Sequence, residues 1–416
     1  MLNKENIREL AYVVTIDSIT SIEGYDRVEL AHIGGWTVVV GKHEFEAGDS
    51  AIYFEIDSKL PEVKPFTDME FLAKKKYKVK TQKMCKSISQ GLLISAEQLG
   101  WTTQIELLNG IKTCAIVDDK NKPHYPNDES RFLTQKLGVI YAIDSDNKRK
   151  AKSVDKYKVM TQRHGKLFSR QPFRFMMKHT WGKKILFVFF GKKKDKKTSW
   201  PVWVKKTDEE RCQNMPWILE DKEPWIVTEK IDGSSTTFTV RRHGKLKTKF
   251  DFFVCSRNVV FDKPDKPCFY DSNIYLEMAE KYDIENKMKA MFFDNEFKGC
   301  EWITIQGETY GSKIQNRDYS IKGHDFKAFN LIDSTHGRWN TIDMKDFLEK
   351  YYDIPCVPIV EKKYILPDTI EELLDYATGT SVCDGLPREG IVLRDYKGEK
   401  SFKAVSNEYL LKYHNG

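Results

Sequence analysis

The stretch WIVTEKIDGSSTTFTV occupies residues 225–240 and carries the sharpest local pattern in the chain. Its apolar first half is typical of a buried strand that ends at Lys230. Asp232 and Gly233 follow, and glycine permits a tight turn into a second β-rich run. A lysine at a strand end beside such a turn can be held close to a phosphate. On these residues alone, an ordinary hairpin with an Asp-Gly turn explains the pattern equally well.

A nucleophilic role for Lys230 would require a particular environment. The amine of a free lysine has a pKa of about 10.4, so at neutral pH it is protonated and cannot attack an electrophile. Burial or neighbouring cations favour the neutral amine. The sequence therefore marks Lys230 as a candidate whose chemistry depends on the residues that the fold brings near it.

Upstream of this stretch, the first hundred residues show short β-rich runs separated by turn residues such as Gly34-Gly35. This spacing predicts a small β-barrel or a sandwich, and an OB-like barrel is compatible with nucleic-acid binding. Strand spacing alone does not distinguish the two architectures. The predicted strands are residues 13–16, 27–30, 36–40, 51–56, 78–80 and 92–94.

From Pro201 onward, strands alternate with helical patterns, which predicts a mixed α+β domain. Helical periodicity covers residues 274–290 and 344–352, and a short helix is expected at 209–211. We therefore expect an α+β protein in which an N-terminal OB-like β-barrel precedes a mixed α+β domain. The predicted bounds are 1–100 for the barrel, 101–200 for a connecting region and 201–416 for the α+β domain.

The charge of the chain is unevenly distributed. Its 416 residues hold 68 Lys and Arg against 61 Asp and Glu, a net charge of +7. Residues 147–200 hold 18 of these cations and only two acids, so the rest of the chain sums to −9. One concentrated basic block favours a polyanionic partner, most simply nucleic acid. The alternative is a solvated charge run without a partner.

Several classes of protein do not fit the sequence. No apolar run reaches the roughly 18 to 20 residues that span a bilayer. The first residues lack the pattern of a secretory signal. The eight cysteines include no CxxC pair, which argues against a disulfide framework or a zinc site. We therefore expect an intracellular, cytoplasmic protein without membrane contact, and we expect it to be a monomer.

The segment Lys230-Ile231-Asp232-Gly233 resembles the KxDG motif of the covalent nucleotidyltransferases, the superfamily of ATP-dependent RNA and DNA ligases and mRNA capping enzymes. One such motif is a weak signal, because four residues with one wildcard recur by chance. Five further segments resemble the remaining motifs of that superfamily in the same order, which makes chance an implausible explanation. They are SRN at 256–258, IQGE at 305–308, DFKAF at 325–329, REGIVLR at 388–394 and SFKAV at 401–405.

The resemblance implies a role for each matching residue. Lys230 would carry AMP covalently, Glu308 would bind the ribose, Phe329 would stack on the adenine, and Arg257 and Lys403 would hold phosphates. Carboxylates such as Glu389 suit a divalent cation. The implied catalytic residues are Lys230, Asp232, Glu389 and Lys403; the nucleotide contacts are Glu229, Lys230, Arg257, Glu308, Phe329, Glu389, Lys403 and Arg211; the metal contacts are Glu389 and Asp232.

The order of domains separates the branches of this superfamily. DNA ligases and capping enzymes place an OB domain after the nucleotidyltransferase domain, yet only thirteen residues follow Lys403. The barrel-like region lies at the N-terminus instead, as in RNA ligases of the Deinococcus and Naegleria type. Residues 35–40, 48–58 and 89–92 resemble their OB domain, and residues 206–214 resemble the segment that precedes their nucleophile.

The resemblance implies an ATP-dependent RNA ligase that seals 5′-phosphate and 3′-hydroxyl RNA ends through lysine-AMP and RNA-adenylate, with a role in RNA repair. It implies ATP and Mg²⁺ or Mn²⁺ as cofactors, and RNA, an RNA-DNA hybrid or a nicked duplex as partner. Two positions depart from the family pattern. Arg394 replaces a lysine, and Lys403 lacks a second lysine two residues away. The alternatives are an mRNA guanylyltransferase and a non-enzymatic RNA-binding protein.

Overall fold

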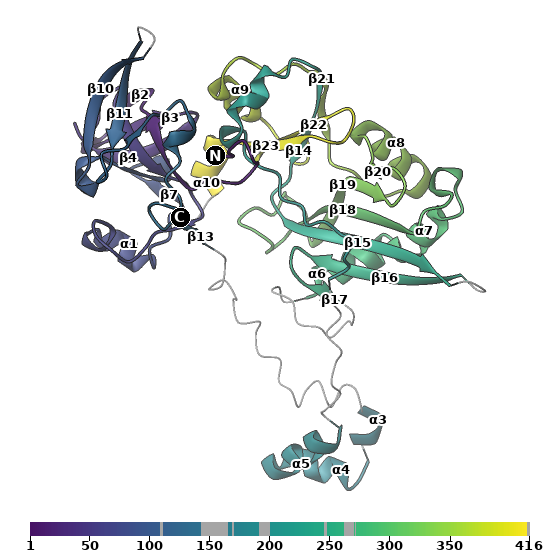
Figure 1. The fold of residues 1–416 in the computed structure, drawn as a ribbon. Coiled ribbons are helices and arrows are strands. Elements are labelled where there is room, and N and C mark those ends of the chain that lie inside the picture. Colours follow the sequence, from purple (N-terminus) through teal and green to yellow (C-terminus); the bar gives the residue numbers. More distant parts are fainter. Residues whose placement is uncertain are drawn as a thin grey trace. The chain divides into compact units, whose positions relative to one another are not determined.

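The computed structural model describes residues 1–108, 111–142, 165–168, 170–190, 200–244, 248–261, 270 and 272–413. The chain divides into two compact units. Figure 1 labels the helices and strands. The first unit combines three segments, Met1–Ser145, Asp208–Ile231 and Val357–Gly416. The second combines Asp146–Thr207 with Asp232–Cys356.

The N-terminal part of the first unit is the expected β-barrel. Two antiparallel three-stranded sheets form most of it, and their inward side chains make two apolar clusters. One sheet has the order β1 (Ala11–Thr15), β5 (Ser50–Phe54), β9 (Leu92–Ile94), and the other β2 (Ser18–Ile22), β3 (Tyr25–Ile33), β4 (Trp36–Gly41). Smaller elements are β6 (Ser58–Lys59), η1 (Phe66–Asp68), α1 (Glu70–Lys74), β7 (Thr81–Met84), β8 (Ser87–Gln90) and η2 (Glu97–Leu99).

The barrel core continues past residue 100. Ile116, Leu133 and Val139 are buried in the same apolar cluster as Ile52 and Phe54. The strand expected at residues 78–80 is instead a single bridge between Lys78 and Lys59, and the strand begins at Thr81. The elements after residue 100 are β10 (Thr102–Leu108), β11 (Ile111–Val117), β12 (Pro123–His124), η3 (Glu129–Arg131) and β13 (Ile140–Tyr141). The three predicted domain bounds stay a prediction.

The remainder of the first unit is built on a four-stranded antiparallel sheet of order β21 (Ile359–Tyr364), β14 (Trp225–Lys230), β22 (Gly390–Asp395), β23 (Ser401–Val405). Helix α9 (Ile370–Ala377) packs on it and begins with a capping box between Thr369 and Glu372. The short helix expected at residues 209–211 is wrong, because helical backbone begins only with η4 (Cys212–Asn214). Also present are η5 (Pro216–Glu220) and α10 (Asn407–Tyr413).

The second unit contains a six-stranded antiparallel sheet. Its order is β17 (Val260–Phe261), β16 (Lys249–Ser256), β15 (Ser234–His243), β18 (Trp302–Gly311), β19 (His324–Asp333), β20 (Gly337–Arg338). Phe238, Ile305 and Phe326 point from one face into an apolar core shared with α6 (Ile274–Lys281), α7 (Ile284–Met291) and α8 (Thr341–Tyr352). The periodicity at 274–290 thus corresponds to two helices, interrupted at Asp283, whose φ is 48°. The turn η6 (Asn295–Phe297) precedes β18.

Part of the basic block also belongs to the second unit. It forms α3 (Gly165–Phe168), α4 (Phe173–Lys178) and α5 (Thr180–Phe190). Residues 147–164, 169 and 191–199 of the block lie outside the described residues. The expected α+β class with an N-terminal OB-like barrel is confirmed. Among the described residues, none of the helices combines the length and the apolar character that a membrane crossing requires.

Candidate active site

Lys230 is the last residue of β14, and the sheet register places it opposite Gly390 of β22. Glu389 immediately precedes that glycine, and its Oε2 lies 2.7 Å from the Lys230 Nζ. The two side chains are 25% and 14% exposed, so the pair is partly shielded from water but remains accessible. Two residues that are 159 positions apart in sequence are therefore joined by the pairing of neighbouring strands.

Lys403 lies on the adjacent strand β23, opposite Val392 of β22. Its Nζ is 3.4 Å from Asp208 Oδ1, and its backbone N–H donates to the Glu210 carbonyl oxygen at 2.8 Å. Burial lowers the pKa of Lys403, and the charges of Arg211 and Lys230 lower it further, while Asp208 opposes the shift. Lys403, Lys230 and Arg211 therefore form one group of cations that is suited to an anionic ligand.

Arg211 connects this group to the barrel. It forms a parallel bridge with Lys403, and its Cζ lies 5.6 Å from the ring centroid of Trp36 on β4, a cation-π distance. Burial lowers the pKa of Arg211, although an arginine keeps its charge at neutral pH. Its Nη1 is buried and has no hydrogen-bond partner in the described part of the chain. A buried donor without a partner is costly, so an anionic ligand would satisfy it.

The side chains of Glu229 and Arg394 are both buried and bonded to other residues of the first unit. The side chain of Glu229 is buried on the face of β14 opposite Lys230, and it accepts hydrogen bonds from the Ser381 hydroxyl and the Val382 N–H. Its nucleotide contact stays a prediction. Arg394, which replaces the family lysine, is buried and pairs with Glu209 Oε1 at 3.1 Å.

Residues 208–210 thus supply a partner to Lys403, a partner to Arg394 and a carbonyl acceptor to β23. No sequence motif assigns a role to these three acidic residues individually. Their only signal was the resemblance of the segment 206–214 to the one that precedes the nucleophile in the related ligases. Trp36 was noted only as part of a barrel strand.

In the second unit, Asp232 and the bend at Gly233 lead into β15. The Asp232 N–H donates to the Tyr319 hydroxyl at 2.6 Å, and Gln315 Nε2 donates to the Gly233 carbonyl oxygen at 2.8 Å. A Cβ at Gly233 would lie 2.4 Å from the carbonyl oxygen of Thr309, so the turn has no room for a larger residue. Tyr319 and Gln315 fix this turn, and no sequence signal pointed to either.

Glu308 and Phe329 belong to adjacent strands of the six-stranded sheet. Glu308 on β18 pairs with Lys327 on β19, on the face opposite the apolar core that Ile305 joins. The register shifts between Gln306 and Gly307, which leaves Phe329 as the extra residue of a β-bulge. A bulge redirects a side chain relative to a regular strand. Phe329 is partly exposed, which suits the expected stacking role.

Arg257 is exposed and directly follows β16, and its neighbour Asn258 accepts a hydrogen bond from Lys206 Nζ at 2.8 Å. The structure therefore brings the predicted residues together as two sets. The first unit holds Glu229, Lys230, Glu389, Lys403 and Arg211, and the second holds Asp232, Arg257, Glu308 and Phe329.

The predicted metal ligands suit a hard cation. Glu389 is an accessible carboxylate, the type of ligand that Mg²⁺ and Mn²⁺ accept. In the described residues, the one cluster of three possible ligand groups is Cys300, Asp333 and His336, which includes neither Glu389 nor Asp232. A cation bound at Glu389 would therefore take most of its ligands from phosphate oxygens and water, as Mg²⁺ commonly does.

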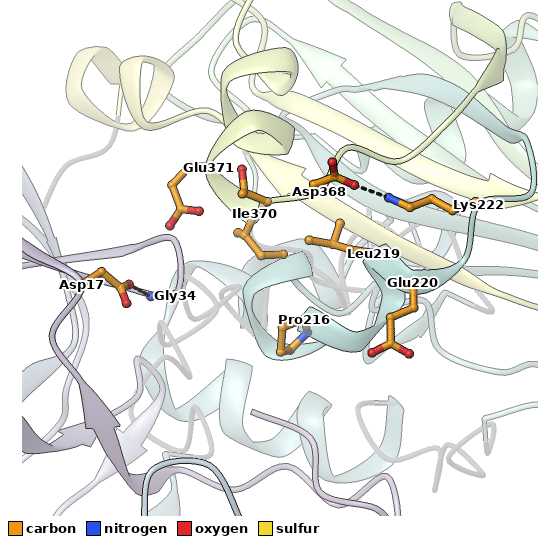
Figure 2. Close-up of a pocket in the computed structure, with 10 residues that line it drawn as sticks. Asp17, Gly34, Pro216, Leu219, Glu220, Lys222, Asp368, Ile370 and Glu371 are labelled. Carbon is orange, nitrogen blue, oxygen red and sulfur yellow. Dashed lines mark hydrogen bonds and ion pairs between the residues drawn. The ribbon is translucent and has the colours of Figure 1, made fainter. Parts of the chain in front are cut away.

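Figure 2 shows a different feature of the first unit, an open pocket of about 640 Å³ between a barrel loop, η5 and the start of α9. Four carboxylates line it, and its one lysine, Lys222, is paired with Asp368 at 2.9 Å. None of the predicted site residues lines this pocket. An acidic lining of this kind repels phosphate, so the pocket does not suit a nucleotide. The carboxylates are Asp17, Glu220, Asp368 and Glu371.

Comparison with known proteins agrees with the motifs. Residues 223–413 match the family model described as RNA ligase, and residues 10–96 match a model described as an OB-fold domain. A search of curated proteins found no significant match. The chain is similar to solved structures of Naegleria gruberi RNA ligase. The structure with pyrophosphate has 24% identity and a TM-score of 0.59, with 98% of this chain and 99% of that chain covered.

A variant of the same Naegleria enzyme, solved with ATP and manganese, gives 24% identity and a TM-score of 0.61, with 97% and 99% of the two chains covered. Another variant, solved with AMP and manganese, gives 24% and 0.60, with 98% and 99% covered. At this identity the likeness shows a shared fold. Together with the two family models, it confirms the resemblance to RNA ligases that carry an N-terminal OB domain. Residues 223–413 are thus similar to the RNA ligase family, and in this chain a segment similar to an OB-fold domain precedes them.

Proposed function

We propose that this protein is an ATP-dependent RNA ligase in which Lys230 is the nucleophile. The observation that carries the proposal is the contact between Lys230 and Glu389 at the end of β14. Lys230, Glu389 and the neighbouring Lys403 lie inside the segment that matches the RNA ligase family, and Arg211 adds a further cation. A reactive amine needs a proton acceptor, and the developing phosphate charge needs fixed cations. This group of residues supplies both.

In the first step, the Lys230 amine attacks the α-phosphorus of ATP. A phosphorus-nitrogen bond forms, the bond to the bridging oxygen breaks, and pyrophosphate leaves. Glu389, 2.7 Å from Nζ, is placed to accept the proton that the amine loses. Arg211 and Lys403 would hold the phosphate oxygens, and the unpartnered Nη1 of Arg211 supports this assignment.

In the second step, AMP passes from Lys230 to the 5′-phosphate of an RNA end. In the third, a 3′-hydroxyl attacks that phosphate, AMP leaves and the strand is sealed. All three steps are in-line transfers at phosphorus, so positioning and charge stabilisation provide most of the catalysis. Glu308 would bind the ribose, Phe329 would stack on the adenine and Arg257 would contact a phosphate.

A divalent cation, Mg²⁺ or Mn²⁺, would neutralise the triphosphate and help pyrophosphate leave. We assign its protein contacts to Glu389 and Asp232. The Naegleria RNA ligase variants solved with ATP or AMP together with manganese support this choice of cofactors. The prediction is that chelation of divalent cations with EDTA abolishes adduct formation, and that excess Mg²⁺ or Mn²⁺ restores it. Full activity in EDTA would contradict the metal assignment.

The decisive test is formation of a covalent protein-AMP adduct from labelled ATP. We expect the wild type to be labelled, and we expect Lys230→Ala to lose the label entirely because no other amine occupies its position. Lys397→Ala, which removes an exposed lysine from the turn between β22 and β23, is the matched control and should label normally. Labelling of the Lys230→Ala variant at the wild-type level would contradict the assignment of Lys230 as the nucleophile.

Two alternatives give different results in the same assay. An mRNA guanylyltransferase would be labelled by GTP rather than ATP. A non-enzymatic RNA-binding protein would show no adduct with either nucleotide. We further propose action on nicked RNA duplexes or RNA-DNA hybrids, as a cytoplasmic monomer. Sealing of nicked substrates whose strands are exchanged one at a time between RNA and DNA identifies the preferred junction.

A further inference from the structure

The helical segment α3 to α5 is not used by the proposed chemistry. Its helices share a small apolar cluster of their own, centred on Phe168 and Leu186. Helices α4 and α5 approach closely, because a Cβ at Gly182 would lie 2.2 Å from the backbone oxygen of Met176. These contacts show that the segment forms packed helices with a defined surface. It is therefore not merely a solvated run of charged residues.

The charge on this surface has one sign. Residues 165–190 contain six Lys and Arg and no Asp or Glu. Arg170 precedes α4, Arg174 and Lys178 follow it at four-residue intervals within α4, and Lys184 lies on α5. All four of these side chains are exposed. An uncompensated group of exposed cations attracts a polyanion.

Aromatic rings lie among these cations. Phe175 and Trp181 are 53% and 54% exposed, which is unusual for such large apolar side chains. His179 joins them: its ring centroid is 4.8 Å from that of Phe175 and 6.1 Å from that of Trp181, with an angle of 16° between the histidine and tryptophan planes. The three rings form an exposed aromatic row.

We infer that this surface docks single-stranded RNA. The basic aromatic patch, as we name it, consists of Arg174, Phe175, Lys178, His179, Trp181 and Lys184. Its cations would contact backbone phosphates, and its rings would stack on bases, the combination that binds single strands without sequence preference. The inference rests on the proposed function, because an RNA ligase must hold an RNA end while AMP is transferred.

An anionic membrane is the competing partner, because Ile185 and Val188 are also exposed on α5. The stacked ring pair favours RNA, since a base has a planar face that matches a ring whereas a lipid headgroup does not. The match of residues 223–413 to the RNA ligase family also provides an RNA substrate. Binding measurements with RNA and with lipid vesicles distinguish the two partners.

The first experiment neutralises the cations in the full-length protein with Arg174→Gln, Lys178→Gln and Lys184→Gln combined. Binding to a 5′-phosphorylated single-stranded RNA, followed by fluorescence anisotropy, should weaken about tenfold at 0.1 M salt, and the salt slope should fall by about 2, or 0.7 per lost phosphate contact. The control triple variant, Lys298→Gln, Lys350→Gln and Lys363→Gln, removes the same charge from exposed positions elsewhere. It should bind within about twofold of the wild type.

The second experiment tests stacking. Trp181→Ala should weaken RNA binding roughly tenfold, and Trp181→Phe, which keeps an aromatic face, should restore most of the affinity. Every variant is also tested for adduct formation with labelled ATP, which should be unchanged. Failure of the wild-type protein to form the adduct would refute the proposed function, but it would not refute RNA binding by the patch.

Equal weakening by the patch and control triple variants would show that only net charge matters and would overturn the inference. Unchanged RNA binding in the patch variants would also overturn it. In a third arm, vesicles with and without phosphatidylserine are added to the same proteins. Vesicle binding that depends on the patch, with unchanged RNA binding, would assign the surface to a membrane instead.

Discussion

At the scale of single residues, Lys403 shows how an environment changes a side chain's chemistry. Its pKa is lowered, first by burial and then by Arg211 and Lys230. A lysine is charged below its pKa, so Lys403 loses its charge as pH rises through a value below the usual 10.4. We predict that the rate of adduct formation falls on the alkaline side in that range, because a neutral amine no longer holds phosphate.

The substitution that checks this assignment is Lys403→Arg. Arginine stays charged above pH 12, so the alkaline fall should move to higher pH, even if the altered geometry lowers the maximum rate. Single-turnover adduct formation measured across pH provides the profile. If the rate of adduct formation falls at the same alkaline pH in Lys403→Arg as in the wild type, the titration of another group causes the fall.

The second prediction at this scale concerns the carboxylate of Glu389. Glu389→Gln keeps the size of the side chain but removes the carboxylate that contacts Lys230 Nζ and suits a metal. Adduct formation should slow by roughly 100-fold or more, as when a general base or metal contact is removed, and should need more Mg²⁺. Metal titrations of the single-turnover rate measure both effects. Glu399→Gln, at an exposed position between β22 and β23, is the matched control.

At the scale of elements, strand β4 of the barrel contributes Trp36, the aromatic partner of Arg211. Trp36→Leu keeps an apolar side chain but removes the ring face. A desolvated cation-π contact contributes about 0.5–2 kcal/mol, so the KM for ATP should rise roughly twofold to thirtyfold. The KM of Trp36→Phe should lie near that of the wild type, because phenylalanine keeps an aromatic face. If Trp36 only filled space, Trp36→Phe and Trp36→Leu would have similar effects. Thermal unfolding of both variants shows whether the barrel itself is intact.

The turn between β14 and β15 shows what the sequence could and could not predict about an element. The pattern around Asp232 and Gly233 predicted a tight connection after Lys230, and the chain bends at Gly233, but β14 and β15 lie in different sheets, so the ordinary hairpin is wrong. The hydrogen bonds from Asp232 to Tyr319 and from Gln315 to Gly233 were not predictable, because they join residues more than 80 positions apart. The bulge at Phe329 was equally hidden, since register is a property of two strands and not of one.

At the scale of the whole molecule, the helices α3 to α5 of the basic block form an apolar cluster of their own. In the described residues, no side chain from 165–190 belongs to the cores of the barrel, the four-stranded sheet or the six-stranded sheet. Replacing residues 147–199 with a Gly/Ser linker removes 18 cations and two acids. We predict that the shortened protein still forms the AMP adduct but binds RNA more weakly, with a reduced salt dependence. Loss of the adduct would show that the block supports the nucleotide site.

The sequence by itself determined the kind of chemistry. Six short motifs in order, from Lys230 to Lys403, together with barrel-like strands ahead of them, were enough to predict an RNA ligase, because each motif is local and each strand follows from its own pattern. The charge count also located the block that carries the basic aromatic patch.

Only the tertiary structure decided which side chains of the site contact one another. Lys230 meets Glu389 across 159 residues, Lys403 meets Asp208 across 195, and Arg211 lies over Trp36 of the barrel. Strand register and close packing create these pairs, and both depend on contacts between distant parts of the chain. The same contacts set the lowered pKa of Lys403 and leave one nitrogen of Arg211 without a partner among the described residues, properties that no local pattern can encode.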